Sequence, residues 1–390
     1  MHPLLSSPRR VLTAVIAILA VAGGTTAAAV TSATAAPARP VASTQTTAAL
    51  PRGGPVPRGF TPVSSTTTRG VTYLLGTAPC STSICTSVVR YDGSAWRGIP
   101  APVVPLATKD LSTRTTTVRD LRFATPSDGW AFGGALWSTH NGGSTWKHVG
   151  AGGPVWDLAT DGRTTYAIVG SCTASGRCDL RLRSTPAGSD TWRDVPGVTA
   201  TGTAARISLG AGTGAVSLGT DSLFVRRGTQ WTKVTNPCAH RAPYVASSAS
   251  SGRIFALCGE GAAGSLYLTT TYSDDQGRHW TTRGGGTRRL QLTNGTFVSI
   301  TAASSQVLYA AAGSPELGGE LMASRDGGVS WQRASGSHGL PNLDSAAAGG
   351  WRYVGASSAS RVVALAATPR RAYWVTHDGG AHWAKNAFAA

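Results

Sequence analysis

Short apolar runs, separated by turn residues, recur along the chain from about residue 59 to its end. Between residues 118 and 149, for example, runs at 118–124, 130–133, 136–139 and 145–149 alternate with turns rich in Gly, Asp and Asn. Such runs predict β-strands, and no segment shows the period of an amphipathic helix. The second run of each group contains mainly small and apolar residues, which indicates a strand covered on both faces.

The groups of runs repeat, and each closes on a tryptophan. Four copies fit the pattern Ser/Thr-x-Asp/Asn-x-Gly-x-x-Trp, and weaker copies end at Trp96, Trp192 and Trp231. The seven tryptophans are 50, 46, 39, 49, 51 and 52 residues apart. A period of about 48 residues suits a four-stranded propeller blade. We therefore predict an all-β fold, a seven-bladed β-propeller of four-stranded antiparallel blades, over residues 59–390.

Each position of the motif has a physical role. The Asp or Asn is expected to accept hydrogen bonds from the amides of its own turn, the Gly to adopt a backbone angle that strains other residues, and the Trp to bury its ring against the neighbouring blade. The residues assigned to these roles are Asn141, Gly143 and Trp146; Asp275, Gly277 and Trp280; Asp326, Gly328 and Trp331; and Asp378, Gly380 and Trp383.

These copies resemble the Asp-box (BNR-repeat) β-propeller superfamily, which includes sialidase-like propellers, sortilin-type receptor domains and photosystem II stability/assembly factors. The resemblance covers about 59–390. The segment 127–131, Ser-Asp-Gly-Trp-Ala, which leads into the motif at 141–146, is most similar to the repeats of the photosystem assembly factors. The motif implies the fold, and carrying a function across would be fold analogy alone.

The first 35 residues are expected to be a signal peptide. Arg9 and Arg10 precede an apolar run at 11–22 that is too short for a membrane span of ~20 residues, and small residues at 33–35 suit a cleavage site. Residues 36–58 have the Ala, Thr and Pro content of a flexible linker. We therefore expect a secreted, extracellular bacterial protein, a monomer without an integral membrane span.

Six cysteines in an exported chain predict three disulfides. Cys80 and Cys85 are close enough in sequence to close one hairpin tip, and Cys172 and Cys178 to close another, which leaves Cys238 with Cys258. In the strand order predicted above, all six fall on one face of the ring, opposite the Asp boxes. Their spacing does not suit a metal, and we expect no cofactor.

By family resemblance, a ligand would lie at the mouth of the ring on the face that carries the cysteines. The candidate mouth residues are Arg114, Arg177, Arg241, Tyr244, Glu260 and Asp344. The chain has a formal net charge of +17, which suits adhesion to an anionic cell-envelope polymer rather than nucleic acid outside the cell. The arginines are scattered, however, so the charge also fits the bias of a GC-rich genome.

Catalysis is not evident from the sequence. A sialidase-like enzyme needs converging arginines, a Tyr nucleophile beside a Glu, and an acidic Asp, and the chain has only three Glu residues and lacks the Arg-Ile-Pro signature. No catalytic residue is assigned. The first hypothesis is a secreted, non-catalytic propeller that binds a protein or a cell-envelope glycan at its disulfide-braced mouth. The alternative is a glycoside hydrolase, sialidase-like or another exo-glycosidase, on the same scaffold.

Overall fold

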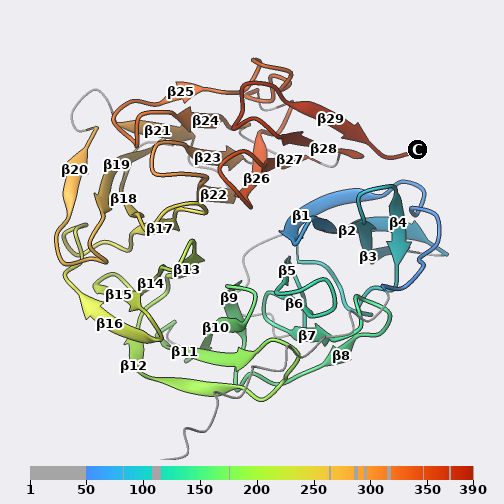
Figure 1. Cartoon of the computed structure of the whole chain (residues 1–390), viewed down its shortest axis with the longest axis horizontal. Coiled ribbons are helices and arrows are strands. Elements are labelled where there is room, and N and C mark those ends of the chain that lie inside the picture. The colour runs from blue at the N-terminus through green and yellow to red at the C-terminus, as the bar shows by residue number, and fades with distance from the viewer. Residues whose placement is uncertain are drawn as a thin grey trace, which may run out of the picture. The chain divides into compact units, whose positions relative to one another are not determined.

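Polar turns at short intervals make the chain reverse direction repeatedly, and the strands between them pair into seven antiparallel sheets. The computed structural model describes residues 50–389 except 82, 108–115, 175, 263–264, 285–288, 294–296, 314–317, 346 and 369. The sheets are the blades of a β-propeller arranged around a central axis (Figure 1). No helix occurs in these ranges, and the predicted seven-bladed fold is confirmed.

Each blade is built from consecutive strands, with the first strand nearest the axis (Figure 1). Blades 1 to 4 consist of β1 (Thr61–Thr68), β2 (Val71–Cys80), β3 (Ser83–Tyr91) and β4 (Trp96–Ile99); β5 (Asp120–Phe123), β6 (Gly129–Phe132), β7 (Leu136–Thr139) and β8 (Lys147–His148); β9 (Val155–Thr160), β10 (Thr164–Cys172), β11 (Cys178–Pro186) and β12 (Arg193–Thr201); β13 (Ala205–Leu209), β14 (Gly214–Leu218), β15 (Ser222–Arg227) and β16 (Gln230–Val234).

Blade 5 differs from the others because its outer strand is interrupted: β20 and β21 both pair with β19. Blades 5 to 7 consist of β17 (Tyr244–Ser247), β18 (Ile254–Ala262), β19 (Ser265–Ser273), β20 (Thr281–Arg283) and β21 (Leu290–Thr293); β22 (Phe297–Ala302), β23 (Leu308–Gly313), β24 (Leu321–Ser324) and β25 (Gln332–Arg333); β26 (Trp351–Ala356), β27 (Val362–Ala366), β28 (Ala372–Thr376) and β29 (Ala384–Ala387).

The second strands form the core of the blades. Every residue of β6, β14, β23 and β27 is buried, as the small and apolar composition of these runs predicts. Burial on both faces follows from the packing of each blade between two others. Neighbouring blades therefore share hydrophobic clusters, such as the one that joins Tyr309 and Leu321 of blade 6 to Val354 and Trp374 of blade 7.

The four full copies of the Ser/Thr-x-Asp/Asn-x-Gly-x-x-Trp motif, which we call Asp boxes, have the same internal hydrogen bonds. The hydroxyl of the first residue accepts a hydrogen bond from the Gly amide, and the carboxylate or amide oxygen of the third accepts one from the amide two residues after the Gly. The hydroxyl-to-Gly amide distances are 2.9 Å for Thr139–Gly143, 2.7 Å for Ser273–Gly277, 2.8 Å for Ser324–Gly328 and 2.8 Å for Thr376–Gly380. The matching oxygen-to-amide distances are 3.0 Å at Asn141–Thr145, Asp275–His279, Asp326–Ser330 and Asp378–His382.

The Gly of each box lies against the preceding blade. Gly380, with a φ of +91°, leaves no room for a side chain beside the Tyr309 hydroxyl of blade 6, and Gly328 leaves none beside Thr270 of blade 5. The motif tryptophans contact the preceding blade as well: Trp146 donates a hydrogen bond to the Pro100 carbonyl (2.8 Å), and Trp383 packs edge-on against Tyr309. The box therefore fixes both its own turn and the distance between two blades.

The ring closes without an exchanged strand, because blade 7 is built entirely from the C-terminal residues 351–387. Trp96 of blade 1 packs edge-on against Tyr373 and Phe388, with ring centroids 5.3 and 5.5 Å apart. The Tyr353 hydroxyl donates to the Ser65 carbonyl (2.8 Å) across the same junction. Closure thus depends on side chains that meet between the two ends of the fold.

Residues 50–58, which composition assigns to the linker, pack along the outer edge of β4 instead. Gly54 and Gly98 exchange two backbone hydrogen bonds of 2.8 and 3.0 Å, and the Pro51 carbonyl accepts one of 2.6 Å from the buried Arg90 guanidinium. A Pro- and Gly-rich segment resembles a linker in composition, but here one β-bridge and one buried cation hold it. The folded part of the chain therefore begins before residue 59.

We expect Trp96→Ala to weaken the ring at its closure. Trp96 is half-buried, so the substitution should lower the free energy of unfolding by roughly 2–4 kcal/mol, somewhat less than for a fully buried aromatic residue. Urea denaturation gives the measurement, and Trp96→Phe is the control because it keeps a ring against Tyr373 and Phe388. Identical unfolding midpoints for Trp96→Ala and the wild type would show that this contact does not hold the ring closed.

Candidate functional site

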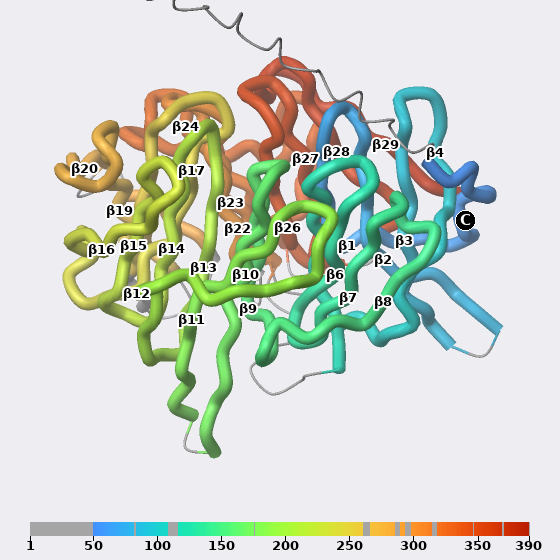
Figure 2. The backbone as a smooth tube through the Cα atoms, turned by 60° about the horizontal axis from the view of Figure 1, so that its bottom comes forward, coloured from blue at the N-terminus to red at the C-terminus, as the bar shows by residue number. Residues whose placement is uncertain are grey.

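The strand order gives the ring two distinct faces. The turns between first and second strands lie on one face together with the Asp boxes, and we call this the turn face. The hairpins between second and third strands and the connections between blades lie on the other, the hairpin face. Figure 2 shows the β2–β3 and β10–β11 hairpins extending from the same side of the ring.

The three disulfides lie on the hairpin face and have the predicted pairing. Cys80–Cys85 and Cys172–Cys178 staple the β2–β3 and β10–β11 hairpins, and Cys238–Cys258 ties the connection after blade 4 to β18. No free cysteine occurs in the described residues. The first two bonds hold the long hairpins of blades 1 and 3, and the third holds the connection between blades 4 and 5.

The residues predicted for the mouth are spread over several blades of the hairpin face. Arg177 lies at the exposed tip of the β10–β11 hairpin, Arg241 donates to the Gly259 carbonyl (3.1 Å), and the Tyr244 ring lies beneath the Arg206 guanidinium. Asp344 is 3.0 Å from Arg333, and its pKa is raised by burial. Only the backbone of Glu260 is described, within β18, and Arg114 lies outside the described residues. Arg241, Tyr244 and Asp344 therefore have separate structural partners and do not converge on a common site.

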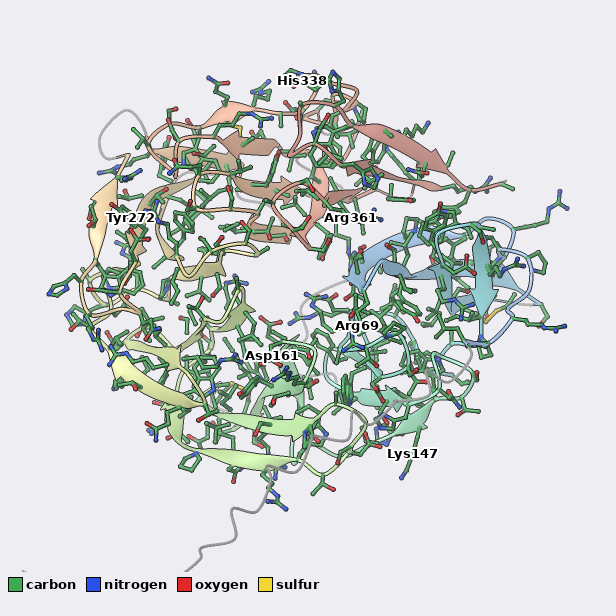
Figure 3. All side chains as sticks on the ribbon, viewed as in Figure 1. Arg69, Lys147, Asp161, Tyr272, His338 and Arg361 are labelled. Carbon is green, nitrogen blue, oxygen red and sulfur yellow. A yellow bond between two sulfur atoms is a disulfide. The ribbon has the colours of Figure 1, made fainter. Side chains whose placement is uncertain are left out.

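A cavity of about 560 Å³ lies instead along the axis and extends to the turn face. All seven first strands contribute to its lining. The charged residues that line it are Arg122 of β5 and, in the turns that follow β1 and β9, Arg69, Asp161 and Arg163. Figure 3 shows Arg69, Asp161 and Arg361 around the central opening. Sequence reasoning did not select the first-strand turns, although Arg or Asp within a turn beside Gly is the signal that would have found them.

Most polar groups along the axis join one first strand to the next. The Ser64 hydroxyl accepts from the Leu121 amide (3.3 Å), Asp157 accepts from the Ile207 amide (2.9 Å), and the Ser208 hydroxyl accepts from the Ser247 amide (2.8 Å). We call these and the corresponding contacts the axial belt. Hydrogen bonds also bridge the four remaining junctions between blades. They join Arg119 to the Trp156 carbonyl (blades 2 and 3), Ala249 to Ala302 (blades 5 and 6), Ser299 to Val354 (blades 6 and 7), and Tyr353 to Ser65 (blades 7 and 1).

The axial carboxylates are similarly occupied. Asp120 accepts from Arg122 (2.6 Å) and from the Leu121 amide (2.8 Å), while the second oxygen of Asp157 accepts from the Leu158 amide (2.8 Å). Burial raises the pKa of Asp157, opposed by the Ile207 amide and by Arg122. The Arg122 pKa is raised despite its burial, because Asp120 stabilises the charged form. These contacts are structural and stabilise the axial belt.

A histidine on the turn face bridges two carboxylates from different blades. His140 Nδ1 is 3.0 Å from Asp128 in blade 2, and Nε2 is 3.2 Å from Asp190 in blade 3. The hydrogen bond to Asp128, assisted by Asp190, raises the pKa of His140 although partial burial opposes the charged form. The histidine therefore links the two blades most strongly when it is protonated.

No group of three or more His, Cys, Asp or Glu side chains in the described ranges is placed to hold a metal ion. In the same ranges, no helix has the length and apolar character to cross a membrane.

The backbone is similar to solved propellers of very different sequence. YCF48 from Cyanidioschyzon merolae aligns over 83% of this chain and 97% of its own, with a TM-score of 0.52 and 13% identity. The Pyrococcus horikoshii acylaminoacyl peptidase aligns over 84% of this chain with a TM-score of 0.51 and 9% identity, and this chain spans 52% of the peptidase. At such identities the likeness shows the fold alone. No family model and no curated protein matches the chain.

The stability lost when a single disulfide is removed should increase with the length of the loop that the bond closes. Cys238 and Cys258 are 20 residues apart, against 5 and 6 for the other pairs. The double variant Cys238→Ala with Cys258→Ala should therefore lower the free energy of unfolding by ~3 kcal/mol, and removal of either shorter-loop disulfide should lower it by ~2 kcal/mol. Urea unfolding of the three double variants measures this, with chemically reduced wild type as the reference for all bonds. A larger loss from Cys80→Ala with Cys85→Ala would contradict the ranking.

The His140 bridge predicts a pH-dependent stability. A pKa raised in the folded state means that the contribution is complete below the unfolded value of ~6.5 and is lost as pH rises through the folded pKa. Urea midpoints measured from about pH 6 to about pH 9 should fall more steeply for the wild type than for His140→Gln. His148→Gln, at an exposed position in the same blade, is the matched control. Parallel profiles for wild type and His140→Gln would refute the bridge.

Proposed function

We propose that this protein is exported and acts without catalysis, as an Asp-box propeller that binds a protein partner through its hairpin face. The observation that carries the proposal is the position of two exposed hydrophobic side chains. Ile84 is 74% exposed at the stapled tip of the β2–β3 hairpin, and Val103 is 93% exposed in the connection that leaves the same blade. The Thr86 hydroxyl donates to the Val104 carbonyl, which holds that connection beside β3.

Rigid, projecting apolar side chains suit protein recognition. A hairpin that is stapled before binding loses little conformational entropy when a partner covers it, so more of the contact energy appears as affinity. Large apolar side chains that are mostly exposed contribute little to packing in the isolated molecule, and in clusters they mark interaction sites. The basic charge of the whole chain would assist the approach of an acidic partner.

Export is supported by the arrangement of residues 1–58 in sequence and by the three disulfides, which form in oxidising compartments. Membership of the Asp-box superfamily is supported by the identical hydrogen-bond pattern of the four full motifs. Binding rather than glycoside hydrolysis is supported by the axial aspartates. A glycosidase needs two carboxylates that face the substrate, whereas the oxygens of Asp157 accept from backbone amides and Asp120 is paired with Arg122.

Photo-cross-linking in the producing cells tests the proposal. A benzophenone amino acid placed separately at Ile84 and at Val103 should give a discrete adduct of the same higher mass from the extracellular fraction. Placement at Arg193, an exposed residue at the start of β12, should give none. Adducts of equal yield from all three positions, or no adduct from the hairpin face, would contradict partner binding there.

Two further measurements separate the proposal from its alternative. Sequencing of the mature N-terminus should begin near residue 36, and retention of the protein in the cytosolic fraction would contradict export. A panel of chromogenic glycosides incubated with the purified protein should give no release above background. Turnover that is lost in Asp157→Asn but kept in Asp194→Asn, an exposed carboxylate on β12, would favour the glycoside hydrolase.

A further inference from the structure

The axial cavity is separate from the hairpin face and has no role in the proposed partner binding. Its volume of about 560 Å³ falls within the usual range of ligand pockets. Of its 29 lining residues, 12 are Ser, Thr or Gly, four are charged and two are aromatic. A cavity of this chemistry suits a hydroxyl-rich ligand better than an apolar one.

Two arginines at the turn-face end of the cavity have unused guanidinium groups. Neither Arg69 nor Arg163 has a side-chain hydrogen bond or ion pair with any residue in the described part of the chain. The nearby carboxylate of Asp161 does not neutralise them, because its oxygens accept from the Arg163 and Thr164 amides (2.9 and 2.8 Å) and from the Arg226 guanidinium (2.6 Å). The cavity mouth therefore carries an excess of positive charge.

The two arginines flank the same part of blade 2. The Thr68 hydroxyl, one residue before Arg69, donates to the Ala124 carbonyl (3.1 Å), and Gly162, one residue before Arg163, faces that carbonyl from the other side. Blades 1 and 3 thus bring one arginine each to either side of a single turn. Other arginines at the same level have partners: Arg253 pairs with Asp274 (2.7 Å), and Arg361 donates to Thr72 (3.0 Å).

Arg69 also has a backbone conformation that its residue type disfavours. Its φ of +46° is followed by a φ of +81° at Gly70, a pair of positive angles that hairpin turns normally give to Asn, Asp or Gly. Strained backbone of this kind is enriched at functional sites. The turn would be more favourable with Asn, so the arginine side chain is not explained by the local fold.

From these observations we propose that the axial cavity binds an anionic sugar, with its carboxylate or phosphate held between Arg69 and Arg163. The planar guanidinium group forms paired, charge-assisted hydrogen bonds with either anion. The rest of the sugar would lie against the Ser, Thr and Gly residues that line the cavity. The site lies on the face opposite the stapled hairpins and is independent of the protein partner.

Calorimetric titration of the full chain tests this site. Digalacturonic acid supplies the carboxylate, glucose 6-phosphate supplies the phosphate, and maltose is the neutral comparison. At least one anionic sugar should bind, at least about tenfold more tightly than maltose, and more weakly when the salt concentration is raised from about 50 mM to about 500 mM. The stronger of the two anionic sugars identifies the anion that the site prefers.

Single variants locate the binding. Arg69→Asn and Arg163→Gln should each weaken binding of the anionic sugar about tenfold or more. Arg193→Gln is the control, because it removes the same charge at the exposed start of β12 and should leave the affinity unchanged. Arg69→Asn should unfold at the same or a higher urea concentration than wild type, because Asn suits the turn, so lost binding cannot be ascribed to misfolding.

Three results would overturn the proposal: no heat of binding from either anionic sugar up to about 10 mM, a range in which any specific site of this kind is detectable; maltose affinity equal to that of the anionic sugars; or unchanged affinity in the Arg69→Asn, Arg163→Gln double variant. None of these bears on partner cross-linking at Ile84. The two proposals can therefore fail separately.

Discussion

The ring depends on hydrogen bonding at its axis, where the inner edges of seven first strands have no partner strand. A buried amide without an acceptor is costly. The axial belt meets this requirement with side-chain oxygens or carbonyls from the neighbouring blade, such as Ser64 for Leu121 and Asp157 for Ile207. Acceptors such as Asp157 for Ile207 and Ser208 for Ser247 come from another blade, so a blade on its own would leave part of its inner edge without hydrogen bonds.

The outer parts of the blades are held by a different interaction. The Asp-box tryptophans and glycines pack against the preceding blade, and at the closure Trp96 contacts Tyr373 and Phe388, which come from the other end of the fold. The axial belt is polar and directional, whereas this outer packing is apolar and depends on shape. Together they fix the position of each blade at both its inner and its outer end.

This division of roles separates structural polar residues from those free to bind a ligand. The axial serines, threonines and aspartates already have backbone partners, whereas Arg69 and Arg163 at the same cavity do not. The two faces also differ: the hairpin face carries stapled, projecting loops with exposed apolar tips, and the turn face carries the charged mouth of the cavity. A single scaffold thus presents two chemically distinct surfaces.

The sequence alone determined the repeat, and with it the number of blades, the order of strands and the turns at the Asp boxes, because those features depend on residues within one period. It also determined the disulfide pairs, since each lies within a short stretch of chain. It misjudged the segment 50–58, whose partners Gly98 and Arg90 lie about forty residues away. Only the tertiary structure decided where a cavity lies and which arginines around it are unpaired. Those properties arise where seven strands from distant parts of the chain converge, and the neighbours of Arg69 or Arg163 at the axis come from other blades rather than from the adjoining sequence.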